Sequence, residues 1–163
     1  MALNPFITPE GRPKLFPNEI LLNFYERVRG TLDLSNEYRS RLRGVLYLTN
    51  ARMVFINSKR SKHIYNFALH LNLIEREDLN VQFPRRSSII GYAKPYMNYM
   101  PNPCNFEFKI KQDPTPFITN LRSLLSQIRT ITIKNTLDEA KSQAFVDPND
   151  PDIIYMVDIG KGN

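Results

Sequence analysis

The sequence predicts a mainly β domain: about seven antiparallel strands in a sandwich or partly open barrel, closed by one C-terminal α-helix. Short runs with a period of two come first, the clearest at Phe106, Phe108 and Ile110, and this period is typical of a half-buried strand. The period then lengthens to that of one helix face, at Phe117, Leu121, Leu124, Leu125 and Ile128. Because strands and helices do not alternate along the chain, a doubly wound α/β fold is excluded.

The 163 residues are enough for one compact domain with a tail. We expect an extended arm over residues 1–18, because prolines at positions 5, 9, 13 and 17 oppose a helix. The domain itself is expected over residues 19–132, and an acidic tail over residues 133–163. Residues 1–135 hold 20 Lys and Arg against 10 Asp and Glu, a net charge of +10, whereas residues 136–163 hold two against six, a net charge of −4.

Seven segments have the composition or the period of strands. The first, Ile20–Arg29, is followed by a polar stretch, Ser35–Arg43, that we expect to be a loop. Gly44–Thr49 and Arg52–Ile56 are two β-rich runs that predict a hairpin around a short turn. Four further strands are expected, at Phe67–Leu73, Leu79–Phe83, Ser88–Lys94 and Phe106–Ile110.

The expected helix has Thr115 as its N-cap and Pro116 at its first position, which tolerates proline. Thr136–Glu139 has the spacing of a capping box, so a short second helix to about Phe145 is predicted. Beyond it, Ile153–Val157 is an apolar run with strand propensity inside an acidic segment. Two hypotheses stay open for the tail: it docks on the basic domain or on a sheet edge, or it is an unstructured acidic extension.

The hairpin segment Gly44–Ile56 carries a resemblance to a known family. The segment resembles the strand-turn-strand signature of GRAM domains. That signature has a small residue, an apolar residue and Tyr-Leu-Thr in the first strand, and Arg, two apolar residues and Phe in the second. Met1–Asn4 and Asn66–Leu71 are similar to the WW-domain-binding protein 2 group. The resemblance implies a pleckstrin-homology-like domain in a membrane-associated or adaptor protein, in a superfamily where phosphoinositide binding is common. The chain departs from that group because no two prolines are adjacent, so WW-domain binding is not expected.

A cluster of basic residues between positions 36 and 62 is the candidate lipid-binding or anion-binding site. Only Glu37 is acidic there, and the segment has a net charge of +6, with Arg52 counted in it. Inositol phosphates and anionic head groups need several converging cations, which Arg forks and Lys point charges supply. The alternative is a solvated basic rim without a ligand. The residues assigned to the site are Arg39, Arg41, Arg43, Lys59, Arg60 and Lys62.

The segment Lys94–Pro103 is the candidate partner-binding loop. Its three prolines exclude a helix and a central strand. Its Tyr and Met side chains are residue types that protein interfaces favour, although they could equally cover a sheet edge. The partner-binding residues are assigned as Tyr96, Met97, Tyr99, Met100 and, in the tail, Tyr155.

The inventory of reactive residues argues against catalysis and metal binding. The chain has two histidines, His63 and His70, a single cysteine, Cys104, and no Gly-rich phosphate loop. No apolar run approaches the roughly 18 residues that a membrane span needs. We therefore expect no enzyme, no cofactor and no metal, in a cytoplasmic protein for which the membrane periphery and the nucleus stay open. No nucleic-acid partner is expected, because core packing explains Phe106 and Phe108 better than base stacking does.

Two functions remain as hypotheses. The first is a non-enzymatic adaptor that associates with acidic membrane lipids, such as phosphoinositides, through its basic loops. The second is a protein-interaction module, of the kind that a transcription coregulator contains, acting through its tail and the loop Lys94–Pro103.

Overall fold

The computed structural model describes the backbone of residues 2–3, 5–34, 38–58, 66–80, 87–95, 103–147 and 150–158, and the side chains of 5–34, 40–58, 66–80, 87–95 and 103–134. The chain divides into two compact units, Met1–Leu125 and Ser126–Asn163, and each is described by itself. The helix α1, Thr115–Lys141, begins in the first unit and ends in the second.

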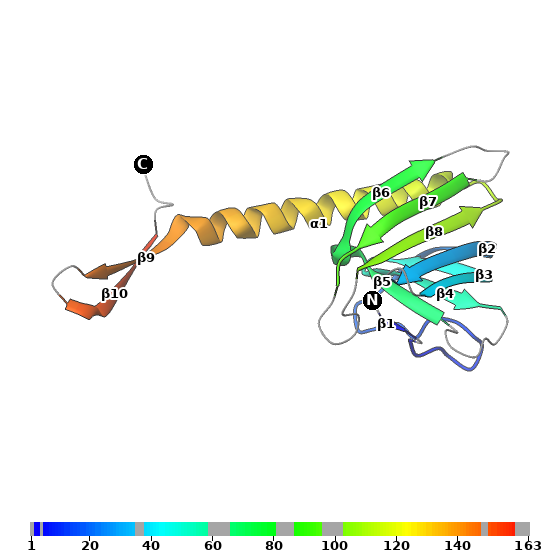
Figure 1. Cartoon of the computed structure of the whole chain (residues 1–163), viewed down its shortest axis with the longest axis horizontal. Helices are drawn as coiled ribbons and strands as arrows, with labels where there is room; N and C mark the ends of the chain where they lie inside the picture. The colour runs from blue at the N-terminus through cyan, green and yellow to red at the C-terminus, as the bar shows by residue number, and fades with distance from the viewer. Residues whose placement is uncertain are drawn as a thin grey trace. The chain divides into compact units, whose positions relative to one another are not determined.

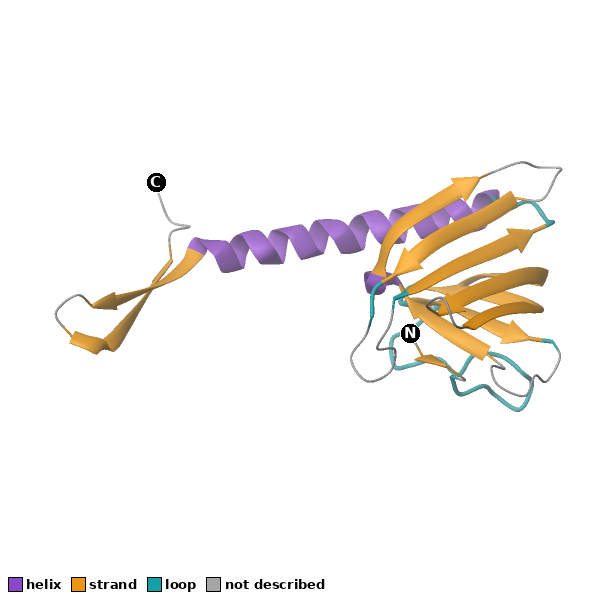
Figure 2. Ribbon diagram, viewed as in Figure 1, coloured by secondary structure: helices purple, strands orange, loops and turns teal. Residues whose placement is uncertain are grey.

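The first unit is a curled half-barrel of antiparallel strands with the start of α1 (Figures 1 and 2), which confirms the predicted fold class. The strand order in the sheet is β1-β5-β4-β3-β2-β8-β7-β6. A 3₁₀ turn, Leu71–Leu73, connects β5 to β6. The strands are β1 (Ala2–Leu3), β2 (Leu21–Leu34), β3 (Tyr38–Thr49), β4 (Arg52–Asn57), β5 (Asn66–His70), β6 (Ile74–Asn80), β7 (Ser87–Ala93) and β8 (Cys104–Ile110).

Aromatic stacking organises the inner face of the sheet. The rings of Phe55, Phe67 and Phe108 stack on one another, with centroids 5.2 to 5.8 Å apart. Phe106 packs against Phe108, and all four rings are buried. Gly91 is required beside them, because a Cβ there would collide with the Phe106 ring. The alternation at Phe106, Phe108 and Ile110 thus marks core positions, as the sequence predicted.

The outer face of β4, of β5 and of the Tyr47 end of β3 is buried as well. Tyr47, Val54 and Ala68 are cross-strand neighbours there and form a second apolar cluster, with Ile56 also buried. The strand predicted at Phe67–Leu73 is present as β5, but it is buried on both faces rather than on one and ends at His70. Burial on both faces of a strand calls for a nearly continuous apolar run rather than an alternating one.

The start of α1 fills the open side of the half-barrel. Phe117, Leu121 and Leu125 are buried, and the Phe117 ring meets the Tyr25 ring edge-on at 5.5 Å. Ile118 is buried too, whereas the expected core residues Leu124 and Ile128 are only partly covered. Thus the helix buries a face slightly rotated from the one that the period indicated.

The cap of α1 differs from the predicted one. Thr115 is the first helical residue rather than the N-cap, and the Asp113 carboxylate accepts hydrogen bonds from the Thr115 backbone N–H (3.0 Å) and hydroxyl (2.6 Å). These two hydrogen bonds lower the pKa of Asp113. An acidic group before the first turn suits both the free N–H groups and the helix dipole.

The predicted second helix is absent as a separate element, because α1 continues to Lys141. No Gly or Pro follows Pro116 within the helix, so nothing in the sequence stops it before the expected capping box. The strands β9 (Ser142–Asp147) and β10 (Asp150–Asp158) follow as an antiparallel pair, and Ile153–Val157 lies in β10. Docking of the tail on the domain stays a prediction.

The bounds of β2 and β3 also differ from expectation. β2 extends to Leu34, beyond the predicted end at Arg29. β3 begins at Tyr38, so the loop predicted for Ser35–Arg43 was wrong from position 38 onward. Leu42 faces the core while its neighbours Arg41 and Arg43 face solvent, so a polar segment still has the period of a strand. Of the strand predicted at Leu79–Phe83, only Leu79 and Asn80 fall in β6, and residues 81–86 lie outside the described residues.

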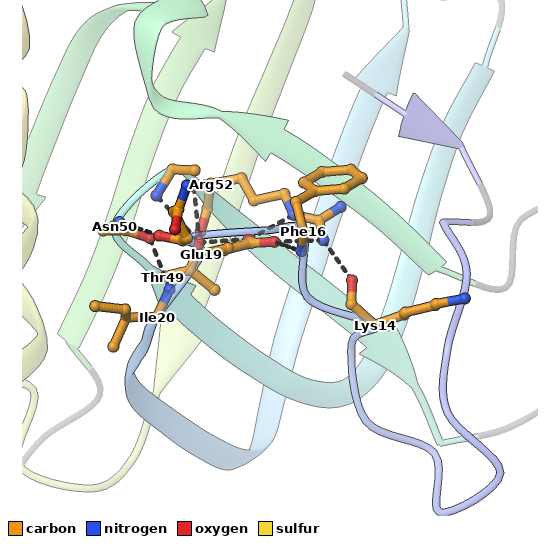
Figure 3. Close-up of polar contacts among 9 residues, drawn as sticks. Lys14, Phe16, Glu19, Ile20, Thr49, Asn50 and Arg52 are labelled. Carbon is orange, nitrogen blue, oxygen red and sulfur yellow. Dashed lines mark hydrogen bonds and ion pairs between the residues drawn. The ribbon is translucent and has the colours of Figure 1, made fainter.

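A buried ion pair attaches the N-terminal arm to the sheet (Figure 3). Arg52 donates from Nε to Glu19 Oε1 at 2.7 Å and from an Nη nitrogen to Glu19 Oε2 at 2.9 Å, in the planar two-bond geometry that arginine favours. The same Nη nitrogen donates to the Lys14 carbonyl at 2.8 Å, and the guanidinium lies 4.1 Å from the centroid of the Phe16 ring. Both ion-pair side chains are almost fully buried.

The Glu19 carboxylate has further donors. It accepts a hydrogen bond from the Thr49 hydroxyl at 2.7 Å and another from the Phe16 backbone N–H at 2.8 Å. Burial by itself raises the pKa of Glu19, but the hydrogen bonds from Arg52, Phe16 and Thr49 outweigh it, so the pKa lies below its ordinary value. The ionised carboxylate is therefore a structural part of the fold.

Leu121→Ala should lower the free energy of unfolding by about 2–5 kcal/mol, because the change leaves a cavity in the core. Chemical denaturation measures this loss. Ile131→Ala, at an exposed position of the same helix, is the control and should change stability by less than about 0.5 kcal/mol. Equal effects of the two changes would place Leu121 outside the core.

Glu19→Ala should cost about 3–5 kcal/mol, because it leaves the Arg52 guanidinium buried without its counter-ion. The matched control is Glu75→Ala, which removes an exposed ion pair with Lys94 (2.8 Å) and should cost less than about 1 kcal/mol. A loss for Glu19→Ala that does not exceed the control's would mean that the buried pair does not hold the arm.

The stability of the wild-type chain should fall in acid partly through Glu19. A carboxyl whose pKa is lowered in the folded state contributes stability that is present above its unfolded pKa of about 4.3 and is lost as the pH falls through its folded pKa. Denaturation curves of the wild type and of Glu19→Gln should therefore differ more at pH 7 than at pH 3. A difference that is constant over this range would contradict the assigned ionisation.

Candidate functional site

Three basic side chains line up across the outer face of the sheet. Arg29 of β2 is the direct cross-strand partner of Arg43 on β3 and of Lys109 on β8. Directly opposite residues have Cβ atoms about 4.5–5.5 Å apart and point to the same face. Arg29 and Arg43 are exposed and Lys109 is partly exposed. We call Arg29, Arg43 and Lys109 the basic row.

The charge of the basic row is only partly balanced. Lys109 forms an ion pair with Glu107 at 3.0 Å. Among the described residues, Arg29, Arg41 and Arg43 form no ion pair. Like charges directly opposite each other destabilise a sheet, so the pair Arg29 and Arg43 costs stability in the free protein. An anion bound between them would remove that cost.

A β-bulge adds another cation beside the basic row. The register of β2 and β3 shifts between Tyr25 and Val28, so Glu26 and Arg27 together oppose one residue of β3. Arg27 has a φ of 56°, in the left-handed region that costs a non-glycine residue about 1–2 kcal/mol. Bulges re-aim side chains, and this one leaves Arg27 exposed two residues before Arg29.

The predicted basic cluster meets the basic row at Arg43. Ser58 donates its backbone N–H to the Arg43 carbonyl at 2.9 Å, and Gly44 pairs with Asn57. The segment that carries Lys59, Arg60 and Lys62 therefore starts beside Arg43, although these three residues lie outside the described residues. Arg41 is exposed on the same face as Arg43, and the backbone of Arg39 lies opposite Asp33 while its side chain is outside the described set.

Arg52 does not belong to the site. Its position in the sequence placed it in the basic cluster, but its guanidinium is buried and paired with Glu19. Arg29 and Lys109, by contrast, were missed. The alternation at Phe106–Ile110 already placed Lys109 on an outer face, but the pairing of β2 with β8 joins positions 80 residues apart and cannot be read from local pattern.

The predicted partner-binding residues stay predictions. Tyr96, Met97, Tyr99 and Met100 lie outside the described residues, and Tyr155 is described only by its backbone in β10. The structure describes the two ends of the loop Lys94–Pro103. Ala93 on β7 pairs with Cys104 on β8, and Cys104 also pairs with Leu34 on β2. The loop thus leaves and rejoins the sheet at the end of β2, where the connection to β3 begins.

The groups suited to chemistry are not arranged for it in the described part of the chain. Burial raises the pKa of the Cys104 thiol to about 12, so it stays protonated. Burial also lowers the pKa of His70, which is partly covered. Among the described residues there is no metal-binding group of three His, Cys, Asp or Glu side chains. No described helix has the length and apolar character to cross a membrane.

Comparison with known proteins supports the fold. No protein-family model and no curated protein matches the sequence. Among solved structures, the chain is similar to the Vps36 N-terminal PH domain, with a TM-score of 0.57 and 20% identity, over 80% of this chain and 95% of that one. A chain of the 8S snRNP assembly intermediate covers 80% of this chain and 89% of its own length at 10% identity, but its TM-score of 0.43 carries no argument. The chain therefore has a pleckstrin-homology-like fold, and its membership of the GRAM family stays an expectation from the sequence.

Proposed function

We propose that this chain is a binding module that docks on anionic lipid surfaces through its basic row. The observation that carries the proposal is the cross-strand alignment of Arg29, Arg43 and Lys109 on an exposed sheet face. The pleckstrin-homology-like fold is typically a non-enzymatic binding fold for lipids or proteins, which agrees with a role in binding.

The chemistry of the basic row fits phosphate groups. Two Arg forks side by side can each donate paired hydrogen bonds to phosphate oxygens, and Lys109 adds a point charge. Anionic membranes attract each nearby Lys or Arg by about 1 kcal/mol, so three or four cations on one face give measurable binding without a deep pocket. Phosphoinositides, with several phosphates on one head group, are the finer form of the proposal.

The loop beside Arg43 strengthens the proposal. Lys59, Arg60 and Lys62 follow Ser58 within four residues of the point where Ser58 bonds to the Arg43 carbonyl. These three cations are close to Arg43 along the chain path, and we include them in the proposed site. A soluble protein partner is the alternative, and the experiment below separates the two.

Reversing two charges of the basic row, in Arg29→Glu/Arg43→Glu, should weaken binding to anionic liposomes more than tenfold, because four units of charge are lost where head groups bind. Cosedimentation with phosphatidylserine vesicles, with and without phosphoinositide, measures this effect. Added salt should weaken wild-type binding, since exposed charges are screened.

The matched control is Arg122→Glu/Lys134→Glu, which makes the same charge change at two exposed positions of α1. It should retain most of the binding. Wild-type-like binding by the Arg29→Glu/Arg43→Glu variant, or the same loss in both variants, would move the contact away from the basic row. If the wild-type protein binds no anionic vesicle, the result would favour a protein partner instead of a lipid surface.

A further inference from the structure

Large apolar side chains lie exposed where the arm joins β2. Ile20 is 61% exposed and Phe24 is 57% exposed, and Leu22 between them is also exposed. Single exposed apolar residues are common on proteins, so the place of each on the sheet decides whether it can take part in a contact surface.

Hydrogen bonds hold the backbone of Ile20, and a ring contact supports Phe24. The Ile20 N–H donates to the side-chain Oδ1 of Asn50 at 2.9 Å, and the Ile20 carbonyl accepts from the backbone N–H of Asn50 at 3.1 Å. The Ile20 side chain points away from the polar network around Glu19 (Figure 3). Phe24 stacks on the Tyr47 ring with centroids 6.0 Å apart, so one side of its ring is supported while more than half of the residue meets water. A rigid contact surface loses little entropy when it binds.

The apolar and basic parts share one face of the sheet. Phe24 is the cross-strand partner of Tyr47, just as Arg29 is the partner of Arg43. Tyr47, Val45, Arg43 and Arg41 are alternate residues of β3 and therefore point to the same side. At about 3.3 Å per residue, the Phe24 contact on Tyr47 lies about 13 Å from Arg43.

We propose that this face is an amphipathic membrane-docking surface: the exposed Phe24 ring enters the acyl boundary of the bilayer while the basic row binds anionic head groups. The inference rests on the proposed function and names how the surface is used. A lipid interface is the occupant that fits, because it offers anionic charge and hydrocarbon side by side, and apolar groups of peripheral proteins sink about 5–10 Å into it. A second copy of this chain would instead have to place equal positive charges against each other.

The chain contains no tryptophan, so a single Trp reports its surroundings without background. Phe24→Trp is the probe, and Ile131→Trp, at a helix position with 59% exposure, is the matched control. On phosphatidylserine/phosphatidylcholine vesicles, the emission of Phe24→Trp should shift to the blue and be quenched by brominated acyl chains, whereas that of Ile131→Trp should not change.

A second measurement separates insertion from charge attraction. Phe24→Ala should keep the thermal midpoint, because the side chain is mostly exposed, and should weaken vesicle binding by about tenfold. The salt dependence of the residual binding should match that of the wild type, since no charge has been removed.

The outcomes separate two claims: that Phe24 inserts into the bilayer, and that the basic row binds anionic lipid. Vesicle binding that Arg29→Glu/Arg43→Glu abolishes, with no quenching of Phe24→Trp, overturns the insertion and leaves the proposed function standing. Equal quenching of both Trp probes overturns the assignment of the inserting face. A concentration-dependent blue shift of Phe24→Trp without vesicles overturns it in favour of a second copy of the chain. Absence of all vesicle binding overturns the inference and the proposed function together.

Discussion

The buried ion pair between Glu19 and Arg52 is the interaction on which the arrangement of the first unit depends. It fixes the arm at the turn between β3 and β4. There the Thr49 hydroxyl donates to the Glu19 carboxylate, and the Asn50 side chain donates to the Asn18 carbonyl and accepts from the Ile20 N–H. An ion pair removed from water is stable only when its donors and acceptors are satisfied, and here every described buried side-chain polar atom has a partner. Because a buried polar network is stable only when all its hydrogen bonds form, the network around Glu19 and Arg52 also fixes the position of the arm.

That fixed position decides which surfaces stay open. The outer face of β3, β4 and β5 has a buried apolar cluster around Tyr47, Val54 and Ala68, next to the strand end that holds the arm. Farther along β3, the same face is open to water and carries Arg41 and Arg43. One strand thus passes from a covered apolar end to an exposed basic end, with Phe24 at the border between them. The proposed docking surface arises from this change along a single strand.

Part of the local structure was predictable from the sequence. The hairpin of β3 and β4 followed from a turn and two strands that lie within a few residues, and the period of α1 identified Phe117, Leu121 and Leu125 as buried, although Leu124 and Ile128 are only partly covered. Arg52 was misread as a surface cation because its partner Glu19 is 33 residues away, and composition cannot show that a charge is buried. Only one of the three residues of the basic row was predicted, for the same reason: Arg43 lies in a cluster that the sequence shows, whereas Arg29 and Lys109 join it only through strand register.

The central claim is that the basic row is the surface that meets anionic lipid. Backbone amide NMR of the chain with anionic nanodiscs, compared with zwitterionic ones of the same size, tests this most directly because it maps the contact residue by residue. The account predicts perturbation at Arg29, Arg43 and Lys109 with the anionic discs alone, and none at Arg122 on the helix. Perturbation confined to other regions, or equal effects of both kinds of disc, would contradict it.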